Sequence, residues 1–518
     1  MSLGRESLQG PAAATKRMMR DARQGFCSGD RAAVNEGGQI SLPNGTRAGS
    51  PKTILGQCSP YTGACYSGDT QESNRTHSRT WHHKHLNAAL LSRSGRHTPA
   101  MATCDVWPAR SSRELREFRR LPRFLRGADP HWVEPLRTEQ AWLLDRARHP
   151  FYVDGEGATA EFFLARDRRT GRAVGRVAAI LNERYNRHRR ESGPAAPIQG
   201  FFGFFDSIDS LDVAGVLLES AARWLRERGA AEMIGPASPS QNYEYGILIA
   251  GHERPHRYLL AYQPPYYQRL LESAGLEKAK DMMSVSLDIE DPVAWAAAKR
   301  WIDRLDVVHR AKERPITVRP IDMRRLDDEV ATAVRLFNQV LSPHWGHVPL
   351  SPGEMADLAR GLRHIIVPDL LLFAERQGEP VGILVAIPDM NAAIRRLRLR
   401  MGALELVELA LRARLTRPDT VRVLLCGVVG ARARLAVAPL LLTRFTVSAA
   451  RLGFRNIDGG WIFEDNQAML SAVLHAGFRC DRVYRLYRRG LEVTLGGVSC
   501  PHADVGPVSA GSGERPGA

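Results

Sequence analysis

The sequence predicts a mixed α/β fold in which one order of helices and strands occurs twice. Short apolar, β-branched runs alternate with amphipathic helical segments along the chain. In two places, paired runs flank a turn glycine, Gly171 or Gly378, as in an antiparallel hairpin. The second set of elements follows the first after roughly 200 residues, the spacing of whole domains. We therefore expect two domains with mixed, mostly antiparallel sheets.

The first set of elements occupies a predicted domain over residues 101–290. It opens with an amphipathic helix over Ser112–Arg126, which Ser111 is placed to cap. The remaining elements expected in this domain are, in order, a hairpin (Ala160–Arg166 and Ala173–Leu181), a strand (Gly200–Phe205), a helix (Val213–Arg228), a strand (from Glu232), a helix (Tyr266–Ala274) and a closing strand (Ser284–Ile289).

A linker helix over 291–314 leads to the second predicted domain, residues 315–490. Its elements repeat the order of the first domain. They are a strand (Ile316–Pro320), a helix (Leu326–Leu341), a hairpin (Leu370–Arg376 and Pro380–Ile387), a strand (Val421–Val429), a helix (Pro439–Gly453), a strand (Asn456–Phe463), a helix (Gln467–Ala476) and a closing strand (Cys480–Arg489).

The two ends of the chain lack periodicity and predict disorder. Residues 1–100 are rich in Gly, Ser, Thr, Asn and Pro, and 491–518 in Gly, Ser and Pro. The leader is interpreted as an over-extended start, with a transit peptide as the alternative. Its histidine run ends at His85 without nearby Cys or carboxylate partners, so we expect no metal there.

Composition indicates a globular protein of the cytoplasm. The apolar fraction is 44%, yet no run of about 18 apolar residues predicts a membrane span. The seven cysteines form no C-x-x-C pair and no disulfide framework. The net charge is +16, but residues 1–100 contribute 7 of it, with 13 Lys and Arg against 6 Asp and Glu. We therefore expect no nucleic-acid partner, and a basic groove would suit an anionic coenzyme.

The chemistry-bearing segment follows the predicted strand Val421–Val429. That strand leads into GARARLAVA (430–438), a helix, a strand and a second helix ending at Gly477-Phe478. Strand, loop, helix, strand and helix in this order resemble the coenzyme half of the GNAT superfamily of N-acyltransferases. The resemblance implies acetyl-CoA as co-substrate, with backbone groups near Val428 and Val429 along its pantetheine arm.

The resemblance also assigns residues to the coenzyme pyrophosphate. The family loop, Arg/Gln-x-x-Gly-x-Gly/Ala, falls on Ala433, Ala436 and Ala438, of which Ala438 alone fits the pattern. Glycines let phosphate oxygens approach the orphan N–H groups of a helix N-terminus. Arg432 or Arg434 is expected to supply the missing cation. The loop is thus a degenerate version of the family motif.

The second helix matches the family spacing N-x(10)-G-[FL], from Asn466 to Gly477-Phe478. The resemblance makes Asn466 a coenzyme contact. The family's tyrosine, which protonates the departing thiolate, is replaced here by Val473, and His475 lies about 200° away on the helix. The chemistry would then depend on positioning and on backbone N–H groups.

A carboxylate at the strand end is the candidate base. Glu464 ends the strand Asn456–Phe463 and is expected to deprotonate the attacking amine, directly or through water. The alternative is that Asp465 and Asn466 cap the following helix and that Glu464 only favours its dipole.

Other candidates lie in loops between the predicted domains. Asn242, Glu244 and Tyr245 are candidates for a pocket lining, or else simply fill hydrogen bonds. Trp345 precedes the segment that shapes the acceptor cleft in the resembled family, or else packs under its own loop. The basic run 395–400 with an apolar stretch behind it is interpreted as a solvated insert, with phosphate or membrane contact as the alternative.

Longer segments resemble tandem GNAT-like bacterial proteins over about Val106 to Leu491. These segments are DPHWVEP (Asp129–Pro135), GFFGFFD (Gly200–Asp206), HWGHVP (His344–Pro349), IPDMNAAIRRL (Ile387–Leu397) and FEDN (Phe463–Asn466). The resemblance implies an N-acyltransferase acting on a small-molecule or peptide amine. The alternatives are an inactive GNAT-fold binding protein and an aminoacyl-tRNA-dependent transferase. In the first domain, aspartates after GFFGFF would repel a pyrophosphate.

Overall fold

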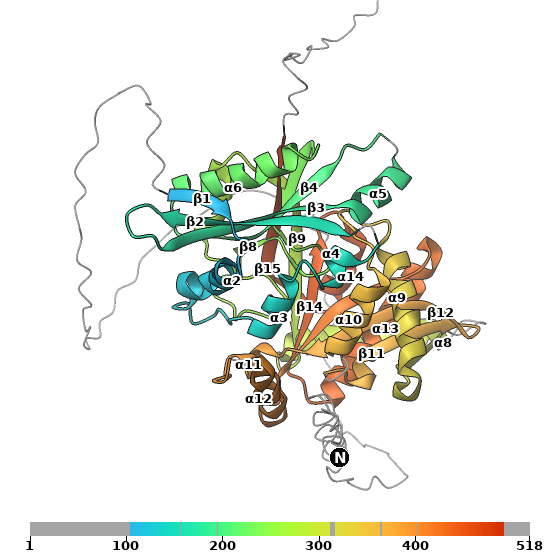
Figure 1. Ribbon diagram of the computed structural model, residues 1–518. Coiled ribbons are helices and arrows are strands. Elements are labelled where there is room, and N and C mark those ends of the chain that lie inside the picture. The colour runs from blue at the N-terminus through green and yellow to red at the C-terminus, as the bar shows by residue number, and fades with distance from the viewer. Residues whose placement is uncertain are drawn as a thin grey trace, which may run out of the picture. The chain divides into compact units, whose positions relative to one another are not determined.

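One 13-stranded mixed sheet with helices on both faces organises the chain (Figure 1). The computed structural model describes residues 104–491 with gaps at 156, 194, 311–315, 363–364 and 401. The predicted disordered leader and tail lie outside the described residues, apart from Leu491. The mixed α/β class is confirmed, as is the repeated GNAT-like order of elements.

The first half contributes the elements up to β9. The helix α2 (Ser112–Arg126) has the predicted bounds and begins with a capping box, in which Ser111 and Glu114 bond each other's backbone N–H. The other elements are β1 (Cys104–Pro108), α3 (Arg137–Leu143), α4 (Pro150–Val153), β2 (Ala158–Asp167), β3 (Ala173–Asn182), α5 (Glu183–Ser192), β4 (Gln199–Ser207), α6 (Leu211–Arg226), β5 (Glu232–Gly235), β6 (Ala237–Ser238), β7 (Glu244–Tyr245), β8 (Ile247–Ala250), α7 (Tyr266–Ser273) and β9 (Glu277–Asp288).

The second half repeats this order after the linking helix α8 (Pro292–Arg310). Its elements are β10 (Thr317–Pro320), η1 (Met323–Arg325), α9 (Leu326–Leu341), α10 (Pro352–Leu362), η2 (Pro368–Leu370), β11 (Leu371–Arg376), β12 (Glu379–Pro388), α11 (Asn391–Ile394), α12 (Gly402–Leu415), β13 (Thr420–Val428), α13 (Ala431–Arg451), β14 (Asn456–Phe463), α14 (Gln467–His475) and β15 (Arg479–Gly490). The segment holding α11 and α12 is an insertion between β12 and β13.

The two halves exchange their closing strands. The strand order runs β1-β2-β3-β4-β5-β15-β9-β14-β13-β12-β11-β10. The closing strand of the first half, β9, pairs antiparallel with β14, and β15 of the second half pairs antiparallel with β5. Each half is therefore completed by a strand of the other, and β9 and β15 pair with each other at the centre.

Each half contains one short parallel strand pair. In the first, β4 and β5 pair over three positions only, and in the second β13 and β14 pair from Thr420↔Asn456 to Arg422↔Asp458. In the first half the chain beyond β5 stays against β4, since the Phe204 N–H donates to the Ser238 hydroxyl oxygen at 2.8 Å. In the second half β13 and β14 have no paired positions beyond Arg422, so the sheet opens between these two strands.

The start of α13 corrects the sequence prediction. We expected a loop over 430–438 and a helix from Pro439, but the helix begins at Ala431, directly after Gly430, and contains Pro439. Gly430 has a φ of 84°, which turns the chain sharply into the helix. An interior proline costs about 3 kcal/mol. Burial of Val437 and Leu441 against the sheet offsets that cost. The glycine and proline in the sequence do not by themselves reveal this burial.

Candidate functional site

The opening between β13 and β14 is the centre of the candidate site. After Arg422 no strand pairs with the β14 side of β13, while β12 continues to pair with its other edge up to Val428. Gly460, with a φ of 72°, lies in the bulge of β14, and a Cβ there would be 2.8 Å from the Val423 oxygen. The backbone of 423–428 thus faces a wedge that widens towards the end of β13.

The N-terminus of α13 lies where β13 ends. Gly430 is its N-cap residue and supplies no side-chain cap. A helix N-terminus without a side-chain cap is the kind of site that can bind an anion. Val428 is buried, and the Val429 N–H donates to the Val381 oxygen at 2.8 Å. Ala438, within α13, is half-buried against the core.

The predicted pyrophosphate residues Arg432, Arg434 and Ala436 have helical backbone. A helical position does not need positive φ, so alanine at 436 carries no backbone strain. Where the family loop has glycines, this chain already has helix, because α13 starts at Ala431 rather than at Pro439.

The helix α14 flanks the other side of the opening. The Asn466 side-chain oxygen accepts a hydrogen bond from the Met469 N–H at 3.3 Å, which confirms its capping role. Val473, at the position of the family tyrosine, is buried in the core. His475 lies beside the Ser471 oxygen, 2.7 Å from its Nδ1, on the exposed face.

Glu464 is held in an ion pair. Its Oε2 lies 2.6 Å from the Lys278 Nζ, and its Oε1 accepts a hydrogen bond from the Asp281 N–H at 3.1 Å. The pKa of Lys278 is raised, chiefly by the hydrogen bond to Glu464. Asp465 does not cap α14 as expected, because its carboxylate pairs with Lys280 at 2.8 Å.

An aromatic cluster surrounds the end of β14. Trp345 meets Phe463 edge-on at 6.0 Å between ring centroids, and Trp461 lies 5.1 Å from Phe463. Tyr245, from β7 of the first half, is 6.4 Å from Trp461. Lys280 lies over the Trp345 ring at 5.8 Å. Both halves therefore line this end of β14, and the sequence had not singled out Trp461 or Phe463.

Polar atoms without partners lie beside this aromatic cluster. The Tyr245 hydroxyl, the Gln241 Oε1 and both ring nitrogens of His347 are buried and have no hydrogen-bond partner among the described residues. A Cβ at Gly346 would be 2.8 Å from the Tyr245 hydroxyl and 3.6 Å from the Gln241 Oε1. Buried polar atoms are normally paired, so these are candidates for contact with a bound polar group.

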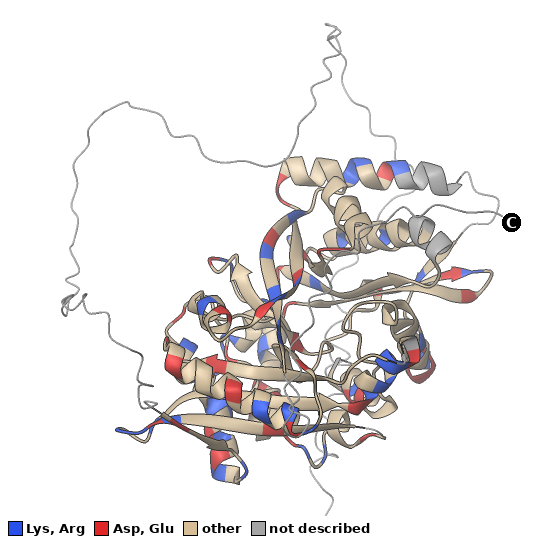
Figure 2. Ribbon diagram, turned by 90° about the horizontal axis from the view of Figure 1, so that it is seen from above, with Lys and Arg blue, Asp and Glu red and all other residues tan. Residues whose placement is uncertain are grey.

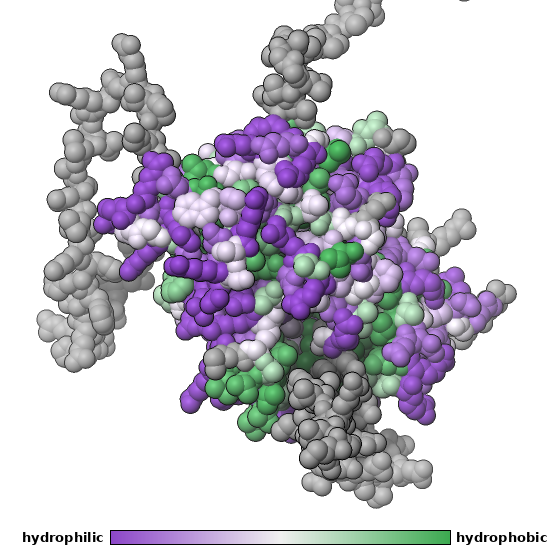
Figure 3. Space-filling view, viewed as in Figure 1, coloured by the Kyte–Doolittle hydropathy of each residue, from purple (hydrophilic) through white to green (hydrophobic). Residues whose placement is uncertain are grey.

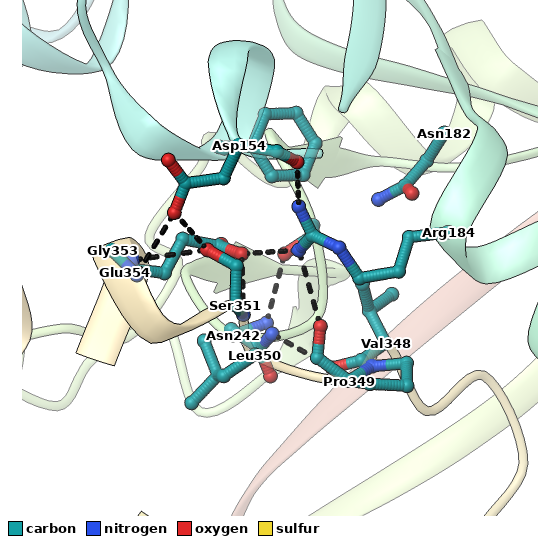
Figure 4. Close-up of polar contacts among 12 residues, drawn as sticks. Asp154, Asn182, Arg184, Asn242, Val348, Pro349, Leu350, Ser351, Gly353 and Glu354 are labelled. Carbon is teal, nitrogen blue, oxygen red and sulfur yellow. Dashed lines mark hydrogen bonds and ion pairs between the residues drawn. The ribbon is translucent and has the colours of Figure 1, made fainter. Parts of the chain in front are cut away.

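First-half residues hold the loop 342–351 that carries Trp345 (Figure 4). The Asn242 Nδ2 donates to the Val348 oxygen at 3.0 Å, and the Arg184 Nη1 donates to the Pro349 oxygen at 3.2 Å. Asn242 thus fixes the loop rather than facing an open pocket. The acceptor side of the candidate site is shaped by contacts between the halves.

Glu354 and Asp154 anchor the same loop at the start of α10. Glu354 is buried and pairs with Arg184 at 2.5 Å, while the Tyr243 hydroxyl donates to its other oxygen at 3.2 Å. Asp154 accepts hydrogen bonds from the Ser351 hydroxyl at 2.7 Å and from a backbone N–H of α10 at 2.8 Å (Figure 4). No sequence motif predicted these pairings, because they join segments about 110–200 residues apart.

Glu244 belongs to a different cluster. In a strand, neighbouring side chains point to opposite faces, so Glu244 and Tyr245 face apart. The Glu244 carboxylate accepts a hydrogen bond from Gln263 at 3.0 Å, and burial raises its pKa while Arg126 opposes that shift. Glu244 thus faces the first half.

The end of β4 in the first half is filled by charged side chains. Asp206 is fully buried and pairs with Arg126 and Arg176, each at 2.7 Å. The Tyr267 hydroxyl donates to it at 2.8 Å. This cluster occupies the place that corresponds to the end of β13 in the second half.

No group of three metal-ligating side chains occurs among the described residues. No helix of that same part of the chain is long and apolar enough to span a bilayer.

Comparison with known proteins gives full-length relatives at low identity. The chain is 29% identical over 395 residues to "Bacterial ceramide synthase" of Caulobacter vibrioides, covering 75% of this chain and 98% of that protein. It is 27% identical over 384 residues to "Protein YghO" of Escherichia coli, covering 73% and 93%. No family model matches.

Among solved structures, a tandem GNAT protein from the clavulanic acid biosynthesis pathway matches with a TM-score of 0.43 and 13% identity, covering 75% of this chain and 99% of that one. At that TM-score the fold assignment rests on the order and pairing of elements described above. That order and pairing show two halves with the same sequence of elements, joined in one sheet.

Proposed function

We propose that the second half is an acyl-CoA-dependent N-acyltransferase. The observation that carries this proposal is the end of strand pairing between β13 and β14, which lies between a helix N-terminus without a side-chain cap and an aromatic cluster with buried polar atoms that have no partner in the described part of the chain. In the GNAT-like reading the pantetheine lies along the backbone of 423–428. The pyrophosphate binds the first turns of α13, with Arg432 and Arg434 as its cations.

The reaction is aminolysis of a thioester. The acceptor nitrogen attacks the thioester carbonyl carbon, the C–N bond forms and the C–S bond breaks, and the coenzyme leaves as a thiolate that takes a proton from water. Glu464 is the proposed acceptor of the amine proton, through water if Lys278 stays paired with it. Asn466 would contact the coenzyme through its amide nitrogen, since its oxygen caps α14.

The acceptor we propose is the amine of a long-chain amino alcohol. A relative covering most of the chain carries the name ceramide synthase, and a ceramide is the amide of such an amine. The aromatic cluster of Tyr245, Trp345, Trp461 and Phe463 offers apolar surface, and the unpaired Gln241 oxygen offers a polar contact for a hydroxyl group.

A ligand titration tests the coenzyme part of this proposal. Acetyl-CoA and a long-chain acyl-CoA should each raise the melting temperature of the full chain, because a ligand that binds only the folded state stabilises it. Release of free thiol should then require a long-chain amino alcohol. Binding without turnover for any amine would favour the inactive binding protein, which the buried Val473 and the ion-paired Glu464 support.

A further inference from the structure

The helix α12 exposes leucines and buries its acids. Leu404 is 50% exposed, Leu411 55% and Leu415 80%, whereas Glu405 is fully buried. At 100° per residue, Leu404, Val407, Leu411 and Leu415 lie on one face of the helix. A surface helix ordinarily has the opposite arrangement, so this exposed apolar face calls for a partner.

Contacts of Glu405, about 100° from Leu404, and of Glu408, at the flank of the apolar face, fix the orientation of α12. The buried carboxylate of Glu405 accepts hydrogen bonds from the N–H groups of Arg137 and Thr138, at 3.1 and 2.9 Å, and so caps α3. Glu408 accepts hydrogen bonds from the N–H groups of Arg398 and its neighbour at 2.9 and 2.6 Å. Since both acids are engaged, α12 cannot turn to bury its leucines without losing these bonds.

The surroundings of the apolar face are basic. Basic and acidic residues are interspersed over most elements in Figure 2, but the segment 395–417 holds seven arginines and two glutamates. The exposed guanidinium groups of Arg398, Arg414 and Arg417 have no hydrogen-bond or ion-pair partner within the described part of the chain. Figure 3 shows hydrophobic surface gathered at the lower left, where Figure 1 draws α12.

We propose that the segment 395–417 docks on the surface of an anionic lipid bilayer. α12 would lie in the plane of the interface with its leucine face among the acyl chains and the unpaired arginines at the phosphates. A neutral, apolar protein surface that covered the leucine face would not require the excess of arginines around that face. The complementary charge of anionic headgroups therefore selects a bilayer over a neutral apolar partner.

The docking segment is joined directly to the candidate site. It lies between the end of β12 and Thr420, the first residue of β13, whose hydroxyl lies 3.0 Å from the Arg257 Nη1. A bilayer held at α12 would thus lie at the start of the strand that forms the wedge. The docking inference does not depend on the proposed acyl transfer, because binding is measured without substrates.

Flotation of the full chain with vesicles tests the inference. We expect binding to vesicles of phosphatidylglycerol and phosphatidylcholine, little binding to phosphatidylcholine alone, and weakening by salt. Leu411→Glu should lower binding by about tenfold or more, since it places a charge in the inserted face. The matched control is Val293→Glu in α8, a residue that is 70% exposed. It should bind like the wild type.

Three outcomes would overturn the inference. One is that the wild-type chain does not float with anionic vesicles. Another is that Leu411→Glu, with an unchanged melting temperature, floats as well as the wild type, so that another part of the chain binds lipid. The third is that the wild type is a dimer in solution that Leu411→Glu dissociates, because a second copy would then cover the face.

Discussion

The carboxylate of Asp154, in the first half, accepts a hydrogen bond at 2.8 Å from the backbone N–H of Gly353, in the first turn of α10. A helix of the second half is therefore capped partly by a residue of the first. The loop that carries Trp345 ends at this cap. The first half therefore helps to hold the loop of Trp345 in place.

Because of this cap, we expect alanine substitutions at two glycines of α10 to change the stability of the protein in opposite directions. A Cβ at Gly353 would lie 2.0 Å from an Asp154 oxygen, whereas nothing lies within 4 Å of a Cβ at Gly361. Gly353→Ala should lower the free energy of unfolding by about 1–3 kcal/mol, because the carboxylate must move and lose its hydrogen bonds. Gly361→Ala should raise it by up to about 1 kcal/mol. Chemical denaturation of both variants measures this, and equal effects would contradict the role of Asp154.

The early start of α13 predicts that two substitutions in its first turns affect different properties, coenzyme binding in one case and stability in the other. Arg434→Glu should abolish the melting-temperature shift given by acetyl-CoA, since it places an anion at the proposed pyrophosphate site. Ala436→Gly should destabilise the fold by about 1 kcal/mol without tightening coenzyme binding, because the position is helical. Equal coenzyme binding by the wild type and Arg434→Glu would remove α13 from the coenzyme site.

The substitution Glu464→Gln tests whether Glu464 is a catalytic base or only the partner of Lys278 in an ion pair. The Glu464 carboxylate is about a third exposed, so losing its pair with Lys278 should cost less than about 1 kcal/mol. Acyl transfer should fall on the order of 100-fold or more if Glu464 takes the amine proton.

The matched control for Glu464→Gln is Lys278→Met. It breaks the same ion pair but leaves the carboxylate in place. Turnover should survive in Lys278→Met and fall in Glu464→Gln. Similar turnover in both variants would make Glu464 a residue that only joins β14 to β9.

His347 predicts a pH dependence of stability. Burial lowers its pKa to about 4, below the ordinary value of 6.5. The folded state therefore binds fewer protons than the unfolded state between these values, so its stability is complete above pH 6.5 and declines as the pH falls towards 4. The contribution at stake is at most about 3 kcal/mol.

Unfolding curves of the wild type and His347→Gln across pH 4–7 would measure that contribution. The variant should show a shallower loss of stability on acidification than the wild type. His256 has a pKa lowered to about 3 by burial and remains in both proteins. The difference between the two curves therefore isolates His347, and parallel curves would contradict its burial as a neutral group.

Local patterns predicted most elements of the sheet and its helices. The bounds of α2, α9 and β14 agree with the prediction, and Ser111 and Gly127 mark the two ends of α2 in the sequence. The hairpin strands β2 and β3 differ by one or two residues. By contrast, β6, β7 and β8 were not predicted, since strands of two to four residues carry too little periodicity.

By itself the sequence determined the repeated order of elements and the approximate positions of β13, β14 and α14, since these depend on periodicity and turn residues close together in the chain. Tertiary structure alone decided where α13 begins and that β9 and β15 change places between the halves. It also decided that Asp154, Arg184 and Tyr245 of the first half contact the second half. A strand presents the same backbone hydrogen-bonding groups to any neighbour. Which neighbour it pairs with is settled by the packing of the whole sheet.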